Sequence, residues 1–199
     1  MSRRRVMVTG LGTVNPIGLN VADTWKNAQS GVSGVKRISR FDPSEFKAQI
    51  AAEVTEFDPE LYMPRKEARR LDRNAQLFWA AADQAMNDSG LSFEEDDPDA
   101  LRAGVACGSG IGGIITFQDE VGVLLERGPS RVSPLAITKI ISNMAAGVAS
   151  IEFNLFGPNI CAVTACAASA NAIGDAAGES QKSNESKSSR HERYPSLIQ

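Results

Sequence analysis

Apolar positions in the first half of the chain alternate between short continuous runs and helical spacings. The run 6–12, VMVTGLG, predicts a short buried strand closed by a glycine turn, and the residues from 20 onward predict a helix. Residues 50–54 read as another strand, within a segment that aspartate–proline pairs otherwise interrupt. Apolar residues then recur every three or four positions over 66–89, which predicts an amphipathic helix that stops at Gly90.

The second half repeats the order of strand, turn and helix. Residues 103–107 predict an apolar strand, and a glycine-rich turn separates it from a predicted helix over 114–127. Small residues are frequent over 134–150, which predicts a helix packed closely against a neighbour. A further strand is predicted over 159–164. Because strands alternate with helices, the pattern indicates an α/β fold with an at least partly parallel sheet.

The periodic pattern ends near residue 176. The segment 179–193 mixes charges with many serines and has no apolar periodicity. Burial cannot offset the chain entropy of such a segment, so we expect it to be disordered. We therefore divide the chain into a folded region, 1–176, and a largely disordered tail, 177–199.

The composition is ordinary for one folded domain, with 42% hydrophobic and 23% charged residues among 199. There are 21 basic and 24 acidic residues, so the net charge of −3 does not favour nucleic acid or a membrane surface as a partner. The apolar runs are too short for membrane insertion. The three cysteines form no CxxC pair and no apolar leader follows the N-terminal arginines, so we expect a reducing, cytoplasmic location.

The three cysteines occupy different places in this pattern. Cys107 and Cys161 lie inside predicted apolar strands and fit small buried fillers. Cys166 follows a strand and precedes an alanine-rich helix, at the turn between them. The N–H groups at the start of a helix stabilise a neighbouring thiolate, which makes Cys166 a candidate nucleophile. A filler role for Cys166 is equally open from this spacing alone.

The glycine-rich turn also fits a second kind of site. Gly108, Gly110 and Gly113 have the G-x-G-x-x-G spacing of a dinucleotide-binding loop, and Glu126 could serve as its ribose-binding acid. However, Glu126 falls inside the predicted helix, with no second strand in the interval. Glycines placed for tight turns and close backbone approach are the favoured explanation, and nucleotide binding stays a remote alternative.

Basic residues gather at the head of the long predicted helix. They are Arg65, Lys66, Arg69 and Arg70, followed by Arg73. Such a group can be a solvated helix face or a docking patch for an acidic partner. His191 lies in the segment expected to be disordered and is not assigned a catalytic role. We find no constellation of residues that predicts a metal site or a cofactor site.

Several motifs together resemble one known family. They are 8–12 (VTGLG), 108–113 (GSGIGG), 142–147 (SNMAAG), 156–159 (FGPN) and 163–167 (VTACA). In this order and spacing the chain resembles the β-ketoacyl-[acyl carrier protein] synthases, in particular the type II enzyme of bacterial fatty acid synthesis. The resemblance implies a thiolase-like fold. This chain would form the N-terminal half of an α/β/α/β/α layered architecture with a mixed sheet, in a protein that works as a homodimer.

The resemblance also implies roles for individual residues. Cys166 would accept the acyl group from acyl carrier protein as a thioester, and its backbone N–H would be one oxyanion donor. Ile111, with Gly110 and Gly112, would border the acyl pocket. Arg65, Lys66, Arg69 and Arg70 would meet the acidic carrier protein. A carbanion formed by decarboxylation of malonyl-acyl carrier protein would then attack the thioester.

The chain departs from the family pattern after about residue 176. In the family, two histidines and a lysine of the second half drive decarboxylation, and this chain has only one histidine, His191. We therefore expect a truncated synthase that is catalytically incomplete by itself. The alternative is a non-catalytic fragment that pairs with itself or with a full-length synthase.

Overall fold

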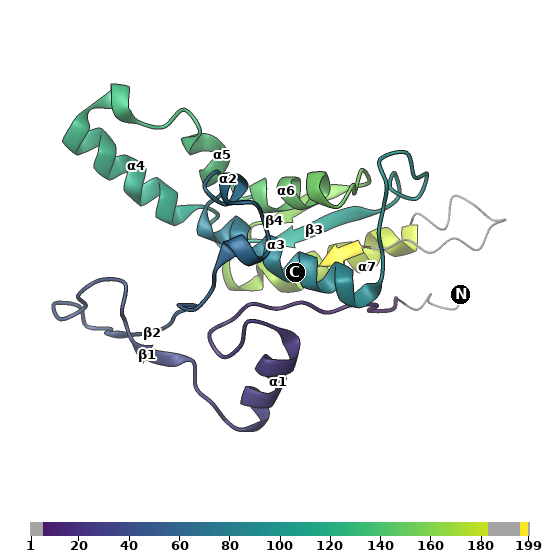
Figure 1. The fold of residues 1–199 in the computed structure, drawn as a ribbon, viewed down its shortest axis with the longest axis horizontal. Helices are drawn as coiled ribbons and strands as arrows, with labels where there is room; N and C mark the ends of the chain where they lie inside the picture. Colours follow the sequence, from purple (N-terminus) through teal and green to yellow (C-terminus); the bar gives the residue numbers. More distant parts are fainter. Residues whose placement is uncertain (1–5, 183–195, 199) are drawn as a thin grey trace.

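A parallel three-stranded sheet forms the centre of the molecule (Figure 1). The computed structural model describes residues 6–182 and 196–198. In the sheet, β3 (Gly104–Gly108) lies between β4 (Asn159–Ala162) and β5 (Ser196–Ile198). β3 and β4 are in register, with Val105 opposite Asn159 and Cys107 opposite Cys161. The predicted strands 103–107 and 159–164 are thus confirmed as neighbours in one sheet.

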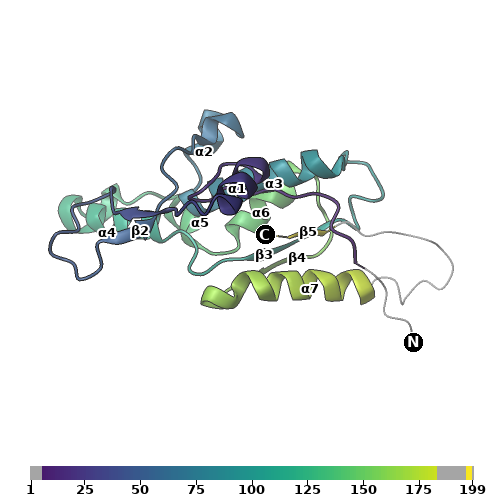
Figure 2. The same cartoon turned by 90° about the horizontal axis from the view of Figure 1, so that it is seen from below.

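Helices cover both faces of this sheet (Figure 2). α7 (Ala168–Lys182) packs on one face, and α3 (Arg73–Ser89) and α6 (Met144–Glu152) lie on the other. The described chain therefore has three layers, α/β/α, which accords with half of a five-layered architecture.

The main core lies between α3, α6 and β3. Phe78 and Met86 of α3 are buried there, and each such side chain contributes roughly 1.5–3 kcal/mol by leaving water. Three alanines of α6 pack against them and are 3% exposed or less: Ala145, Ala146 and Ala149. Because these side chains are small, α6 approaches its neighbours closely, as the small-residue pattern predicted.

The predicted helix over 66–89 is divided into two. α2 (Arg65–Ala68) is separated from α3 by a turn, after which Asp72 adopts an extended conformation and accepts a hydrogen bond from the Asn74 N–H at 3.0 Å. This bond makes Asp72 the N-cap of α3, and a cap interrupts a helix that periodicity alone would continue. At the other end Gly90 has φ +67° and terminates α3 as expected.

The predicted helix over 134–150 is also divided, into α5 (Ala136–Ile140) and α6. Ile141 between them is extended, with ψ 138°. α4 (Ile114–Arg127) has the predicted bounds, and it projects away from the sheet together with α5 (Figure 1). Three short 3-10 helices complete the connections within the described residues: η1 (Pro59–Leu61), η2 (Pro129–Arg131) and η3 (Ala165–Ala167).

The strand predicted over 6–12 is wrong, because this segment runs along α3 instead of joining a sheet. The Leu11 N–H donates to the Asp88 carboxylate at 2.9 Å. A methyl group added to Gly12 would collide with the backbone of Ala81 in α3. The glycines thus serve close backbone approach, and the chain then enters α1 (Val21–Gln29) at the predicted place.

Antiparallel pairing occurs in a separate ribbon, in which β1 (Val35–Arg37) pairs with β2 (Ile50–Ala52). In the described residues the main sheet is parallel throughout. The sequence predicted parallel and antiparallel pairing within one mixed sheet, but the antiparallel pair forms a sheet of its own. β2 confirms the strand read at 50–54, whereas its partner β1 was not expected.

Parts of the segment that was expected to be disordered have regular secondary structure. The backbone of 179–182 is helical as the end of α7, and 196–198 form β5, so the predicted disorder is wrong for these residues. The remainder of that prediction, 183–193, lies outside the described residues. Within the part of the chain that is described, no helix has both the length and the apolar character needed to span a membrane.

Candidate active site

Cys166 lies in η3, the single turn that connects β4 to α7. Its side chain is exposed, whereas Cys107 is buried and Cys161 is half-buried. The preceding residue, Ala165, has φ +49°, a backbone conformation that residues other than glycine rarely adopt. Such a sharp turn presents the residue after it to solvent, directly before a helix begins. The position predicted for Cys166, between a strand and a helix, is thus confirmed.

The start of α7 is held against the sheet on two sides. The Asn171 side-chain amide donates to the Thr164 hydroxyl at 2.8 Å, which links the first turns of α7 to the end of the strand segment. Ala168 is 3% exposed and lies over Gly108 of β3. A Cβ at Gly108 would lie only 2.5 Å from the carbonyl carbon of Ala168. Cys166 therefore stands on a turn whose two ends are fixed.

Residues 109–113, here called the glycine loop, lie at the same edge of the sheet. The Ser109 N–H donates to the Ala162 carbonyl at 3.0 Å, directly beyond the paired ends of β3 and β4. Both loops leave the carboxyl ends of adjacent parallel strands, where α/β folds place their sites. The fold therefore brings Ile111, Gly110 and Gly112 to the edge that carries Cys166. Ile111 is 67% exposed.

The glycine loop is held by hydrogen bonds. Gly112 has φ +89°, and its N–H donates to the Ser109 hydroxyl at 3.0 Å. On the other side, the Gly113 N–H donates to the Ile140 carbonyl at 2.9 Å. The Ser142 hydroxyl donates to the Ile111 carbonyl at 3.2 Å. The glycines here allow tight turns, as the favoured explanation of the motif required.

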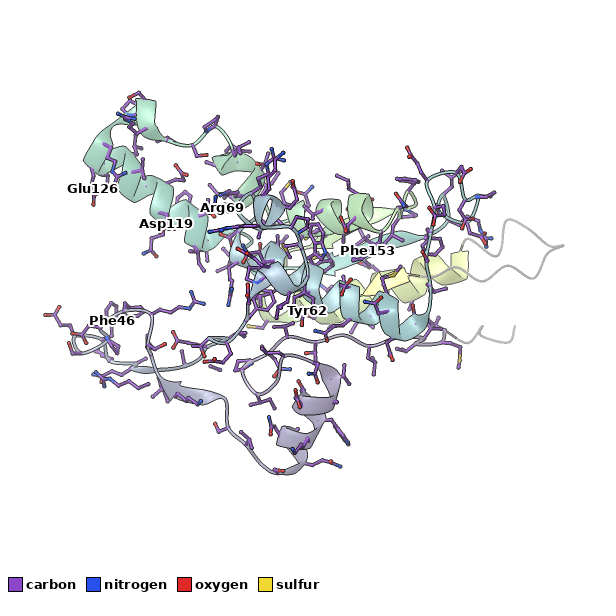
Figure 3. The ribbon with its side chains drawn as sticks, viewed as in Figure 1. Phe46, Tyr62, Arg69, Asp119, Glu126 and Phe153 are labelled. Carbon is purple, nitrogen blue, oxygen red and sulfur yellow. The ribbon has the colours of Figure 1, made fainter. Side chains whose placement is uncertain are left out.

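The N-terminus of α4 does not resemble a phosphate site. The Asp72 carboxylate accepts hydrogen bonds from the N–H and the hydroxyl of Thr116, at 2.9 and 2.7 Å, where a bound phosphate would compete for donors. Glu126 lies in the last turn of α4, on the projecting end of that helix (Figure 3). These positions argue against the dinucleotide alternative. The sequence pattern does not single out Asp72, although aspartate is a preferred N-cap residue.

Cys107 and Cys161 face each other on β3 and β4. Burial, and secondarily the neighbouring Cys161, raises the pKa of the Cys107 thiol to about 12. The Cys161 thiol donates to the Ser142 carbonyl at 3.3 Å. Cys107, 1% exposed, packs in the main core, and Cys161 packs against it. Both positions agree with the predicted filler role.

The four predicted docking residues are exposed, on α2 and the turn after it. Arg65 and Arg70 pair with Glu60 and Glu67, each at 3.2 Å. Lys66 and Arg69 form no ion pair with any described residue, and Arg69 is labelled in Figure 3. Two of the four charges are thus available to an acidic partner.

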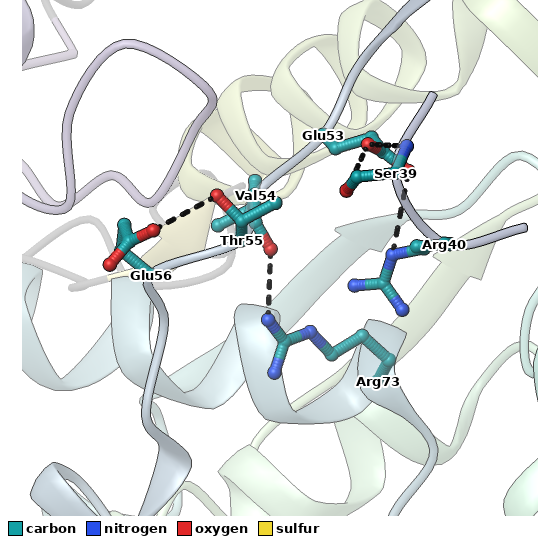
Figure 4. Close-up of polar contacts among 7 residues, drawn as sticks. All are labelled: Ser39, Arg40, Glu53, Val54, Thr55, Glu56 and Arg73. Atoms are coloured by element: carbon teal, nitrogen blue, oxygen red, sulfur yellow. Dashed lines mark hydrogen bonds and ion pairs between the residues drawn. The ribbon is translucent and has the colours of Figure 1, made fainter. Parts of the chain in front are cut away.

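Arg73 does not belong to this exposed group. Its guanidinium donates to the carbonyl oxygens of Val54 and Phe57, at 3.0 and 3.3 Å, and lies over the Phe57 ring. Figure 4 shows the contact with Val54. Burial, with a smaller effect of nearby Arg40, lowers the pKa of Arg73. Arg73 therefore ties the segment before η1 to α3 and leaves four residues in the basic patch.

The parallel sheet with helices on both faces, and an exposed thiol in the turn between β4 and α7, define a thiolase-like α/β protein. The chain belongs to the beta-ketoacyl synthases: the family model of the beta-ketoacyl synthase N-terminal domain matches residues 3–188. In the described residues no group of three or more histidine, cysteine or acidic side chains could hold a metal ion.

Known proteins of this family are similar over most of the chain. A 3-oxoacyl-[acyl-carrier-protein] synthase 2 of Coxiella burnetii is 48% identical over 177 residues, which are 89% of this chain and 42% of that protein. The ishigamide ketosynthase/chain length factor has a TM-score of 0.80 and 29% identity over 92% of this chain and 45% of its own. In a structure of a type II PKS acyl-carrier protein in complex with its ketosynthase, one chain is similar with a TM-score of 0.74 and 25% identity, over 92% of this chain and 47% of that one. The chain spans less than half the length of each of these proteins.

Proposed function

We propose that this chain is the N-terminal part of a 3-oxoacyl-[acyl carrier protein] synthase of fatty acid synthesis, and that Cys166 is its acyl-accepting nucleophile. The observation that carries the proposal is the exposed thiol of Cys166 on a fixed turn before α7, beside the glycine loop. The similarity to synthases that carry this name supports it.

The proposed chemistry is the transfer of an acyl group to a thiolate. The Cys166 thiolate attacks the thioester carbonyl of an acyl group on its carrier protein. A new C–S bond forms to Cys166, the old C–S bond breaks, and the carrier thiolate leaves. The Cys166 backbone N–H stabilises the oxyanion of the tetrahedral intermediate. In a complete synthase, the carbanion from malonyl-acyl carrier protein then attacks this thioester and releases the sulfur. The groups that drive decarboxylation belong to the second half of the family fold, so we expect no β-ketoacyl product from this chain alone.

The direct test is transfer of a labelled acyl group from acyl carrier protein to the 199-residue chain. Wild type should carry the label in a hydroxylamine-sensitive thioester, and Cys166→Ala should carry none. Cys161→Ala is the matched control. It removes a half-buried thiol of β4, the strand that precedes Cys166, and this variant should retain the label. Equal labelling of wild type and Cys166→Ala would refute the assignment of the nucleophile.

The proposed partner is an acyl carrier protein that docks on Arg65, Lys66, Arg69 and Arg70. A structure of a ketosynthase with its acyl-carrier protein is among the similar folds, which supports a partner of this class. We place this activity in the cytoplasm, because the three cysteines, Cys107, Cys161 and Cys166, are all free thiols.

A second candidate function is a non-catalytic fragment that pairs with itself or with a full-length synthase. One observation favours it: large apolar side chains are exposed along α4 and on β4, including Phe117, Leu125 and Ile160. Surfaces of this kind mark sites of association. We propose a homodimer, and light scattering after size-exclusion chromatography would test it. Leu125→Arg should weaken association, whereas Leu61→Arg in η1, where the leucine is 76% exposed, should not.

A further inference from the structure

Asp72 is the only charged side chain that the fold buries among the described residues, with 4% of its surface exposed. One carboxylate oxygen accepts the Asn74 N–H at 3.0 Å and caps α3. The other accepts both the N–H and the hydroxyl of Thr116, at 2.9 and 2.7 Å. A single carboxylate therefore joins the start of α3 to the first turn of α4.

This junction lies directly beside the glycine loop. Thr116 is three residues beyond Gly113, where the loop passes into α4. The Asn74 side-chain amide also reaches the Ser109 hydroxyl, at 3.5 Å, and that hydroxyl accepts the Gly112 N–H. Both ends of the loop are thus connected to the N-terminal turn of α3.

Besides the Asp72 bonds, the start of α4 is held by the hydrogen bond from the Gly113 N–H to the Ile140 carbonyl. None of its residues is buried, so hydrophobic packing contributes little to its position. Hydrogen bonds to a charged acceptor are stronger than neutral ones, and they are strongest where water is excluded. The bonds from Thr116 to Asp72 are therefore a strong side-chain restraint on the first turn of α4.

We propose that Asp72 is a positioning residue for acyl-chain selection: through Thr116 it fixes the first turn of α4 and thereby the place of Ile111 at the acyl pocket. This inference rests on the proposed function, in which Ile111 borders the pocket. When the bonds are lost, the loop moves more freely and the pocket admits longer chains relative to short ones.

The test compares rates of Cys166 acylation by palmitoyl- and butyryl-loaded acyl carrier protein in the full chain. Thr116→Val removes the hydroxyl with little change of shape, and Thr116→Ser keeps it. Asp72→Asn removes the negative charge of the acceptor. The matched control is Asn20→Ala, which removes another helix N-cap, the one that accepts the Asp23 N–H at the start of α1. Amide hydrogen exchange of residues 109–117 is the second readout.

Thr116→Val and Asp72→Asn should raise the palmitoyl-to-butyryl rate ratio and the exchange rates about tenfold, the effect of one strong hydrogen bond. Thr116→Ser and Asn20→Ala should stay close to wild type in both readouts. Normal acylation with an unchanged ratio in Thr116→Val would overturn this inference alone. A wild-type chain that accepts no acyl group would overturn the proposed function, and the selection role with it.

Discussion

The exposure of Cys166 depends on the conformation of one neighbouring residue. Ala165, with φ +49°, turns the chain so that Cys166 faces solvent while Ala168, two residues later, is buried against β3. For a residue other than glycine this conformation costs about 1–2 kcal/mol. The bond between Asn171 and Thr164 and the packing of Ala168 offset that cost.

We expect Ala165→Val to lower the free energy of unfolding by about 1–3 kcal/mol, because a β-branched side chain fits positive φ poorly. Ala165→Gly should change it by less than about 1 kcal/mol, since relief of strain and the greater freedom of the unfolded chain oppose each other. Urea unfolding measures both. Ala167→Val in the same turn is the control, and an equal loss in that variant would show that positive φ is not the cause.

Cys107 makes the stability depend on alkaline pH. Its pKa is about 12 in the folded protein and ordinarily 9.0, so the unfolded chain releases this proton at a lower pH. The contribution of the neutral Cys107 thiol to the free energy of unfolding is therefore complete below pH 9.0 and is lost as the pH rises toward 12. The urea midpoint should therefore fall between about pH 8 and about pH 10.5, and less so in Cys107→Ala. Cys166→Ala should retain the wild-type decrease; a flat wild-type profile would contradict the prediction.

At the scale of elements, close contact between α7 and β3 sets the position of the site. Gly108 ends β3 directly beneath the first turn of α7. The same glycine precedes the glycine loop, so one position serves both the packing of α7 and the start of that loop. Burial of Asp72 plays the corresponding role between α3 and α4.

Gly108→Ala should lower the free energy of unfolding by about 1–3 kcal/mol, because the new methyl group forces the backbone of α7 away from β3. It should also slow alkylation or acylation of Cys166 as the turn shifts. Gly110→Ala is matched to it, since nothing lies within 4 Å of a Cβ there, and should be close to neutral in stability. Thermal unfolding compares the two variants. Equal losses in both would show that contact with Ala168 does not limit the position.

At the scale of the whole molecule, the basic patch and many of the exposed large apolar side chains lie on different elements. α2 presents basic side chains, whereas α4 and β4 expose large apolar ones. With a net charge of −3, the molecule as a whole does not attract an acidic protein, so the proposed docking of a carrier protein relies on the local charge of the basic patch. The apolar surface suits a permanent partner and the basic patch a transient one.

Lys66→Glu should slow acyl transfer from acyl carrier protein about three- to tenfold at low salt, because Lys66 is exposed and has no acidic partner among the described residues. The difference should shrink as salt screens the charges. Transfer from a small neutral acyl thioester should be unaffected. Lys26→Glu in α1 changes the net charge equally and controls for it; the same slowing there would exclude a local docking effect.

Several features were predictable because they depend on residues close together in the sequence. The bounds of α4, the stop at Gly90 and the turn that carries Cys166 follow from local periodicity, glycine and the strand-to-helix transition. The motifs that resemble the synthases also predicted the family that the comparisons show. Local pattern is sufficient where hydrogen bonds and burial join near neighbours.

Other features depend on contacts between distant segments, and only the tertiary structure decided them. The run 6–12 is apolar enough for a strand, but it bonds to α3 because its glycines fit against that helix. Arg73 looks like part of a basic surface, yet its guanidinium is drawn inward by backbone carbonyls 16 and 19 residues away. Asp72 reaches Thr116 across 44 residues. The sequence by itself determined the place of Cys166 between a strand and a helix. The fold decided what holds them in place, because long-range hydrogen bonds and close packing leave no periodic trace along the chain.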